Sequence, residues 1–142
     1  MRRTLPHFIT ERFGNILRVP RPLSSEIHTA LLQSAARLFY ERGIGITGVD
    51  AVAAAAGVGK PAVYRHFQSK AGLLDATLAK RDADRRKTLA HALEHSPASP
   101  IGRLKAAIDW QLEWVASPHF RGCGFVRAAA ELGARVAIGF WG

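Results

Sequence analysis

The chain has little cysteine, little acidic charge and no long apolar segment. Cys123 is its only cysteine, so an intrachain disulfide is excluded and the chain fits a reducing cytoplasm. No apolar run approaches the roughly 20 residues that a membrane-spanning helix needs. We therefore expect neither a membrane protein nor a disulfide-stabilised secreted domain.

The sequence also lacks the residue patterns of a nucleotide-binding or metal-dependent enzyme. Residues 57–60, Gly-Val-Gly-Lys, are not a phosphate loop, because Ala54 stands where that loop needs glycine and Pro61 where it needs serine or threonine. Only His91 and His95 share a helix face, and without a third ligand we interpret them as surface side chains. No nucleophile with a nearby base is visible. We predict no enzyme activity, no cofactor and no metal.

Acidic residues are scarce beside basic ones, 11 against 20, which leaves a formal net charge of +9. The excess is uneven: residues 1–87 hold 15 Lys and Arg against 7 Asp and Glu, whereas residues 88–142 hold 5 against 4. A basic domain joined to a nearly neutral one is typical of a protein that binds a polyanion. An anionic membrane surface is the alternative partner, and the helix pair described next favours nucleic acid over it.

Two short helices joined by a glycine turn are predicted over residues 47–67. The first has apolar residues at positions i, i+3, i+4 and i+7. These are Val49, Val52, Ala53 and Ala56. Gly57 ends this helix, because only glycine adopts the left-handed conformation there without penalty. Gly59 caps the second helix and Pro61 stands in its first turn, where a missing N–H is tolerated. This is the pattern of a helix-turn-helix.

The second short helix has two unlike faces. Val63 and Phe67 lie four residues apart and should face the core. The other side carries Lys60, Ala62, Arg65 and His66. Donor side chains near an electropositive helix N-terminus suit phosphates and base edges in a major groove. The alternative is a solvated charged face on an ordinary small bundle, and the helix pair alone does not choose between the two.

The run Gly-Val-Gly-Lys-Pro-Ala-Val-Tyr-Arg-His-Phe-Gln-Ser-Lys at residues 57–70 resembles the signature of the TetR family of bacterial transcriptional regulators. The likeness extends back through Thr47, Gly43 and Phe39 to the start of the preceding helix. It implies an all-α fold, with a three-helix helix-turn-helix head that binds DNA followed by a helical effector and dimerisation domain. It also implies a homodimer on double-stranded operator DNA.

The resemblance implies a set of DNA-binding residues. They are Thr47, Gly48, Lys60, Pro61, Ala62, Tyr64, Arg65, His66 and Lys70. By the same resemblance Thr47 and Tyr64 would bind phosphate, and Lys70 would anchor the DNA backbone. The chain departs from the family pattern at Gly59, which replaces a hydroxyl cap, and at Ala62, which replaces a commonly polar residue. One base contact is therefore expected to be apolar only.

Apolar stripes predict the helices on either side of this motif. A helix over residues 25–42 should cover the back of the two short helices, and Ile44 and Ile46 should pack the loop after it. A longer helix starts at Ser69. After a linker at residues 96–100, a further helix carries an apolar stripe. The stripe consists of Ile101, Leu104, Ile108, Leu112 and Val115.

We divide the chain into three parts. Residues 1–23 hold five Arg against one Glu, with three prolines, and are expected to be a basic disordered arm. This arm either tracks the minor groove or precedes the true start of the protein. Residues 24–84 are expected to form the helix-turn-helix domain, and residues 85–142 part of a ligand-binding, regulatory domain. The resemblance stops at about residue 132, where we expect the chain to be truncated or frameshifted.

In the family that this chain resembles, the helix after the linker lines an effector pocket. We therefore take as pocket candidates Trp110, Trp114, Phe120 and Cys123. The alternative for two Trp residues one turn apart is core or interface packing.

These observations predict a sequence-specific DNA-binding transcriptional regulator in the bacterial cytoplasm, on the nucleoid when bound to DNA. It would be a repressor that a small apolar effector releases. The alternative is a shortened regulator that binds DNA weakly, or acts as an interaction module without effector response. That alternative arises because the helices that form the family's dimer are expected to be absent, which puts the homodimer in doubt.

Overall fold

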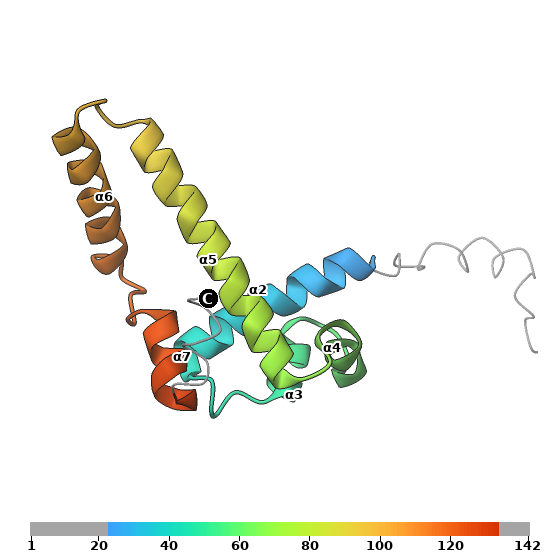
Figure 1. The fold of residues 1–142 in the computed structure, drawn as a ribbon. Coiled ribbons are helices and arrows are strands. Elements are labelled where there is room, and N and C mark those ends of the chain that lie inside the picture. Colours follow the sequence, from blue (N-terminus) through green and yellow to red (C-terminus); the bar gives the residue numbers. More distant parts are fainter. Residues whose placement is uncertain (1–22, 134–142) are drawn as a thin grey trace, which may run out of the picture.

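The computed structural model describes residues 23–133, and the described chain is entirely helical (Figure 1). Its helices are α2 (Ser24–Arg42), α3 (Val49–Ala55), α4 (Lys60–Phe67), α5 (Lys70–Glu94), α6 (Pro100–Val115) and α7 (Gly124–Leu132). The expected all-α fold is confirmed. The predicted arm up to residue 22 and the predicted chain ending from residue 134 lie outside the described residues. Within residues 23–133 no helix has the length and apolar character needed to cross a bilayer.

Four helices share one hydrophobic core and form a unit that we call the head: α2, α3, α4 and the first half of α5. Each contributes a side chain with no exposed surface, and these are Leu31, Val52, Val63 and Leu73. Burying a Val or Leu side chain stabilises a fold by about 1.5–3 kcal/mol. Phe39 and Phe67 lie in the same core, as their spacing in the sequence predicts.

The turn between α3 and α4 closes as a Schellman motif. Gly57 has a φ of +69°, and its N–H donates to the Ala54 carbonyl at 3.1 Å. The Val58 N–H donates to the Ala53 carbonyl at 3.0 Å, and its side chain packs on the core. These bonds satisfy carbonyls that the end of α3 leaves without intrahelical partners. The predicted helix-turn-helix is therefore present, with Gly59 as the N-cap of α4.

The start of α5 is set by two small residues. The Ser69 hydroxyl oxygen accepts a hydrogen bond from the Gly72 N–H at 3.0 Å, as expected of an N-cap. A Cβ atom at Gly72 would overlap the carbonyl oxygen of Phe67. Glycine at this position therefore lets the end of α4 and the first turn of α5 approach closely, which fixes where Lys70 lies relative to α4.

The loop between α2 and α3 is only partly packed. Ile44 is buried, as predicted, with 4% of its surface exposed. The expectation for Ile46 is wrong, because this side chain is 81% exposed. The loop turns sharply into α3, and only one of its two isoleucines can face the core.

Beyond the head, α5 continues outward, α6 returns beside it, and α7 comes back to the head (Figure 1). Ala128 of α7 is 1% exposed and belongs to the core cluster of the head. α5 crosses the expected domain boundary between residues 84 and 85 without a break. The DNA-binding and regulatory parts that we expected therefore share a helix and a core contact.

α6 faces α5 with its Trp side and not with its apolar stripe. Arg85 of α5 lies over the rings of Trp110 and Trp114. The stripe residues are between 44% and 77% exposed. They are Ile101, Leu104, Ile108, Leu112 and Val115. A continuous exposed stripe of this kind differs from the single hydrophobic residues that are scattered over most protein surfaces.

Candidate DNA-binding surface

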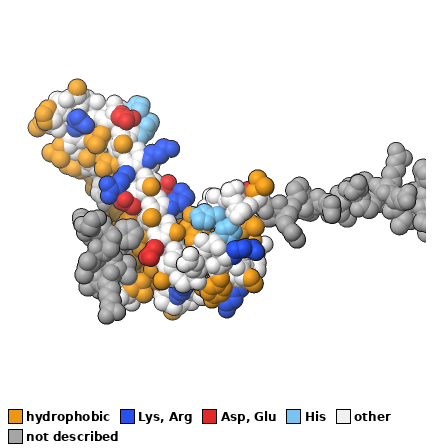
Figure 2. Space-filling view, turned by 45° about the vertical axis from the view of Figure 1, so that its right-hand side comes forward, with side chains coloured by type: hydrophobic (Ala, Val, Ile, Leu, Met, Phe, Trp, Pro, Cys, Tyr) orange, Lys and Arg blue, Asp and Glu red, His pale blue; other side chains and the backbone are white. Residues whose placement is uncertain are grey.

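The helix-turn-helix presents one outer surface, which we call the recognition surface. Its exposed members are Gly48, Lys60, Pro61, Tyr64 and Arg65. Gly48 and Gly59 are the N-cap residues of α3 and α4, and neither helix start has a side-chain cap hydrogen bond within residues 23–133. Lys and Arg side chains are spread over the head and over the helices that extend from it in Figure 2, and His side chains lie on the head as well. The structure thus brings five of the predicted DNA-binding residues together on exposed surface.

Lys60 is paired with an acidic residue that the sequence analysis did not single out. Its Nζ lies 3.0 Å from Oδ2 of Asp50, which is exposed on α3. This hydrogen bond, and then the charge of Asp50, raise the pKa of Lys60 above its ordinary value of 10.5. The pair therefore places a positive and a negative side chain next to each other on the recognition surface. The sequence feature that indicates this pair is the position of Asp50 in the first turn of α3, ten residues before Lys60.

Arg65 and Tyr64 stand beside this pair. Tyr64 is 45% exposed, and its ring is free to approach a phosphate with the hydroxyl group. Arg65 is exposed and makes no ion pair or side-chain hydrogen bond within residues 23–133. A guanidinium that has no protein partner keeps its five donors available for a base edge or a phosphate.

Two of the predicted contacts are buried in the structure of the free chain, and their roles in DNA binding stay predictions. Thr47 is 2% exposed, and its hydroxyl donates to the Gly43 carbonyl at 2.6 Å, near the end of α2. In this conformation the hydroxyl proton of Thr47 is directed to the protein backbone and not to the surface. Ala62 is 6% exposed, although its position in the helix suggested the outer face. The outer-face position predicted for Ala62 from the helical spacing is not observed, because α4 buries a face wide enough to include Ala62 beside Val63 and Phe67.

His66 and Lys70 are half-buried at the edges of the recognition surface. The His66 ring lies 5.7 Å from the ring of His28 in an edge-on arrangement, and His28 stacks on Phe67 at 4.6 Å. This contact holds the end of α4 against α2. Lys70 donates from Nζ to the Gly45 carbonyl at 3.4 Å, which places its ammonium group over the α2–α3 loop.

The backbone of Gly45 is also held by α7. Its N–H donates to Oε2 of Glu131 at 2.7 Å. Arg127 contacts Glu131 through Nε at 3.1 Å and donates from Nη1 to the Tyr40 carbonyl at 2.9 Å. We call Arg127 and Glu131 the α7 clamp. No local pattern predicted it, because its partners in α2 and the loop are more than 80 residues away.

The clamp also has an electrostatic signature. The hydrogen bond from the Gly45 N–H lowers the pKa of Glu131 below its ordinary value of 4.5, and Arg127 adds to this effect. A backbone N–H and a guanidinium both favour the ionised carboxylate. The clamp therefore ties α7 to the loop that leads into the helix-turn-helix, and it does so with a charge-assisted bond.

A second concave region lies between α2, α5 and α6. It is an open cleft of about 810 Å³. The Cζ atom of Arg85 lies 4.4 Å from the ring centroid of Trp110 and 4.1 Å from that of Trp114. The Nη2 group of Arg85 also donates to Oε1 of Gln111 at 2.9 Å. Both predicted Trp residues line this cleft. Their indole faces are already occupied by a cation, an arrangement worth roughly 0.5–2 kcal/mol for each contact.

The other two pocket candidates do not line the cleft. Phe120 packs edge-on against Trp114 at 4.8 Å, behind the cleft wall. Cys123 is the half-buried N-cap residue of α7. The cleft wall is also more charged than an apolar effector would require. Its charged members are Lys80, Arg81, Asp84, Arg85 and Glu113.

One group of side chains within the described residues could hold a metal ion: His91, Glu94 and His95. It lies at the end of α5 remote from the recognition surface (Figure 1). The sequence analysis found two of these residues and missed Glu94 as a third ligand.

Comparison with known proteins agrees with this geometry. Residues 31–77 match the family model described as bacterial regulatory proteins, tetR family. The chain is 36% identical over 98 residues to the HTH-type transcriptional activator FasR of Mycolicibacterium smegmatis, covering 69% of this chain and 42% of FasR. It is 32% identical over 75 residues to the HTH-type transcriptional repressor DhaR of a Mycobacterium species, covering 53% of this chain and 38% of DhaR.

A solved structure shares the fold. SCO4454, a TetR-family transcriptional regulator from Streptomyces coelicolor, matches with a TM-score of 0.71 and 37% identity, covering 78% of this chain and 59% of that one. The matched part of the chain spans less than half the length of FasR and DhaR. The helix-turn-helix, the sequence relatives and the shared helical architecture together assign the chain to the TetR family of bacterial regulatory proteins.

Proposed function

We propose that this chain binds a specific duplex DNA sequence and regulates transcription. The observation that carries the proposal is the two-sided packing of α4. Val63 and Phe67 are buried in the head, while Lys60, Tyr64 and Arg65 are exposed on the opposite side. A short helix anchored in this way can enter a major groove and present donors to base edges.

The exposed side chains divide into two roles. We assign base reading to Arg65, because its guanidinium has no partner within residues 23–133 and can bind guanine O6 and N7 together. We assign phosphate binding to Tyr64, Lys60 and Lys70, which lie on either side of it along the chain. Phosphate contacts set the position of the head, and the base contact supplies sequence preference.

We further propose that the chain acts in the bacterial cytoplasm as a repressor, in pairs, and responds to a small effector in the α2–α5–α6 cleft. DhaR is a repressor and FasR an activator, so the relatives support regulation of either sign. An effector with an apolar body would displace Arg85 from Trp110 and Trp114 and shift the population toward a different α5 tilt. The spacing of two heads would then no longer match half-sites about 34–36 Å apart.

The alternative is a shortened regulator that binds DNA weakly or pairs with another protein. The exposed apolar stripe of α6 favours it, because nothing within residues 23–133 covers those side chains. This alternative keeps the recognition surface but removes the effector response. The two functions differ in how many chains bind one DNA duplex.

Fluorescence anisotropy with duplexes selected from random sequences tests the DNA-binding proposal. We expect Arg65→Ala to weaken binding to the selected site by about 1–3 kcal/mol and to relax base preference at one position. Tyr64→Ala should weaken binding to all sequences about equally. Arg103→Ala is the control, since it removes the same charge from an exposed site on α6. An unchanged preferred site in Arg65→Ala, or no DNA binding even at low salt, would contradict the proposal.

A further inference from the structure

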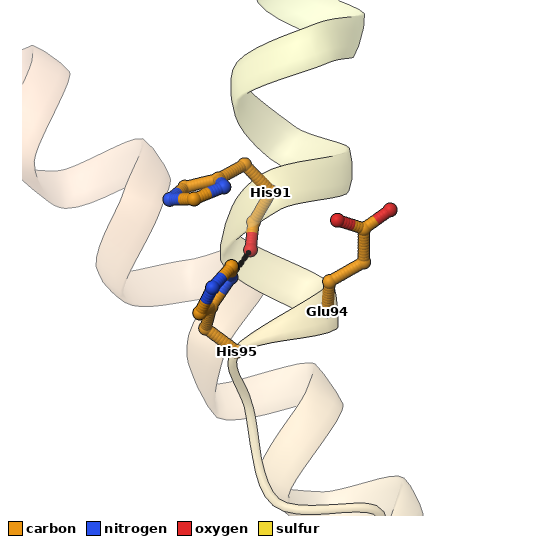
Figure 3. Close-up of side chains that lie close together, drawn as sticks. All are labelled: His91, Glu94 and His95. Carbon is orange, nitrogen blue, oxygen red and sulfur yellow. Dashed lines mark hydrogen bonds between the residues drawn. The ribbon is translucent and has the colours of Figure 1, made fainter.

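The C-terminal end of α5 gathers three side chains with metal-ligating atoms. His91, Glu94 and His95 are all exposed, and one candidate ligand atom from each lies within 4.8 Å of the others. The two imidazole rings are one helical turn apart, with centroids separated by 4.1 Å. Figure 3 shows both rings on one side of the last turn and the Glu94 carboxylate on the other. Glu94 is exposed, and an exposed side chain of this kind exchanges readily between rotamers.

The structure prepares His95 to act as a ligand. Its Nδ1 lies 2.8 Å from the carbonyl oxygen of His91. A carbonyl can only accept a hydrogen bond, so Nδ1 must carry the proton. In the neutral ring, Nε2 then holds the free lone pair. Ligating histidines commonly have their other ring nitrogen fixed in this way by a backbone carbonyl or a carboxylate.

The position in the helix also favours a cation. His91 and Glu94 lie in the last turn of α5, and His95 is its C-cap residue. The last carbonyl groups of a helix carry a partial negative charge, and the Glu94 carboxylate adds a full one. Two histidines at i and i+4 on one helix face are also the spacing used by helical zinc sites.

We propose that His91, Glu94 and His95 form a binding site for a divalent ion of the late first-row transition metals, with Zn²⁺ as the representative. Two imidazole nitrogens and one carboxylate oxygen would supply three ligands, and water the fourth. Imidazole suits Zn²⁺, Ni²⁺ and Cu²⁺, whereas Mg²⁺ and Ca²⁺ prefer oxygen ligands. The site is separate from the recognition surface and does not depend on the proposed DNA binding.

A bound ion would join the last turn of α5 to the residue that caps it. The chain leaves the helix directly after His95, through Ser96 and Pro97, and turns toward α6. An ion that bridges His91 and His95 therefore opposes fraying at this corner. Because it binds the folded helix and not the unfolded chain, it raises the melting temperature by mass action.

Calorimetric titration of the untagged full chain with Zn²⁺ tests the site. We expect one ion per chain, and His91→Ala or His95→Ala should weaken binding by roughly 10- to 100-fold or more, the loss seen even for partners of metal ligands. Zn²⁺ should raise the melting temperature of the unmodified chain but not of His91→Ala. Glu94→Gln should also weaken Zn²⁺ binding, but by a smaller factor than His91→Ala or His95→Ala.

Two controls separate this site from other ligands in the chain. His119→Ala removes an exposed histidine elsewhere, and Cys123→Ser removes the only thiol, and neither should change the affinity. Helical content by circular dichroism shows whether each variant folds. Equal affinity in His91→Ala and the unmodified chain, or loss of binding in Cys123→Ser, would overturn the proposal. Displacement of Zn²⁺ by an equal concentration of Mg²⁺ would overturn the assigned metal class.

Discussion

At the scale of single residues, Asp50 is the side chain whose role the structure adds to the recognition surface. It holds Lys60 at 3.0 Å and keeps the lysine protonated, since the pair raises the pKa of Lys60. Lys60 loses its proton, and with it the ion pair, only when the pH rises through its raised pKa, which lies above 10.5. Lys60 is therefore a cation throughout the physiological range. What varies is whether it faces Asp50 or a phosphate.

Replacement of Asp50 by asparagine is expected to strengthen DNA binding. The change removes a negative charge next to the phosphates and frees Lys60, so the slope of log K against log salt should become steeper by about one unit. Anisotropy titrations at several salt concentrations measure this slope. Asp109→Asn, which breaks the Lys105 pair on α6, is the matched control. A weaker or unchanged affinity in Asp50→Asn would mean that the pair positions Lys60 productively.

Gly72 stands at a position where the fold leaves no room for a side chain. In Gly72→Ala the new Cβ would meet the Phe67 carbonyl oxygen, which is backbone and cannot rotate away. We expect a loss of about 1–3 kcal/mol in the free energy of unfolding, as for other overpacked sites. Urea denaturation measures it. Ala71→Ser, at the adjacent exposed position, should change stability by no more than about 0.5 kcal/mol.

At the scale of helices, the α7 clamp connects the distal part of the described chain to the helix-turn-helix. Glu131 and Lys70 both hold the backbone of Gly45, Glu131 by accepting from its N–H and Lys70 by donating to its carbonyl. A shift of α7 therefore acts on the loop that leads into α3. Because Lys70 is a proposed phosphate contact, we propose that the clamp couples the position of α7 to DNA binding.

Replacement of Glu131 by glutamine should loosen this contact. Because the pKa of Glu131 in the folded chain is lower than its ordinary value of 4.5, the ionised carboxylate stabilises the fold above pH 4.5. This contribution to stability is lost as the pH falls through the pKa of Glu131 in the folded chain. At pH 7 we expect faster amide exchange at Gly45 in Glu131→Gln, measured by NMR. Glu113→Gln, exposed on α6, is the control. Equal Gly45 protection in both variants would contradict the clamp.

At the scale of the whole molecule, the number of chains on one duplex separates the two proposed functions. If two heads bind one operator together, half-sites on the same face of the duplex should bind far better than half-sites rotated by half a turn. We expect insertion of five base pairs between half-sites to lower affinity by roughly 10²- to 10⁴-fold, the avidity of two linked sites. Anisotropy with both duplexes measures it. Insensitivity to spacing would favour the shortened, weakly binding regulator.

Local patterns were sufficient for the helix-turn-helix. The Gly57 turn and the buried side of α4 follow from residue spacing and from the backbone freedom of glycine, both of which act within a few positions of the chain. The same holds for the Ser69 cap and for the positive charge of the N-terminal part. The helix pair and the exposed position of Arg65 could therefore be predicted from the residues, whereas the all-α fold of the whole chain was predicted from the family resemblance.

Contacts between distant segments decided the rest. Thr47 was expected at a phosphate, but the end of α2 takes its hydroxyl. The apolar stripe of α6 is exposed, and the opposite, Trp-bearing side of this helix contacts Arg85 of α5. Glu131 reaches Gly45 across 86 positions of the chain. Each outcome depends on which surfaces meet when helices pack, and a periodic pattern within one helix carries no information about its partner.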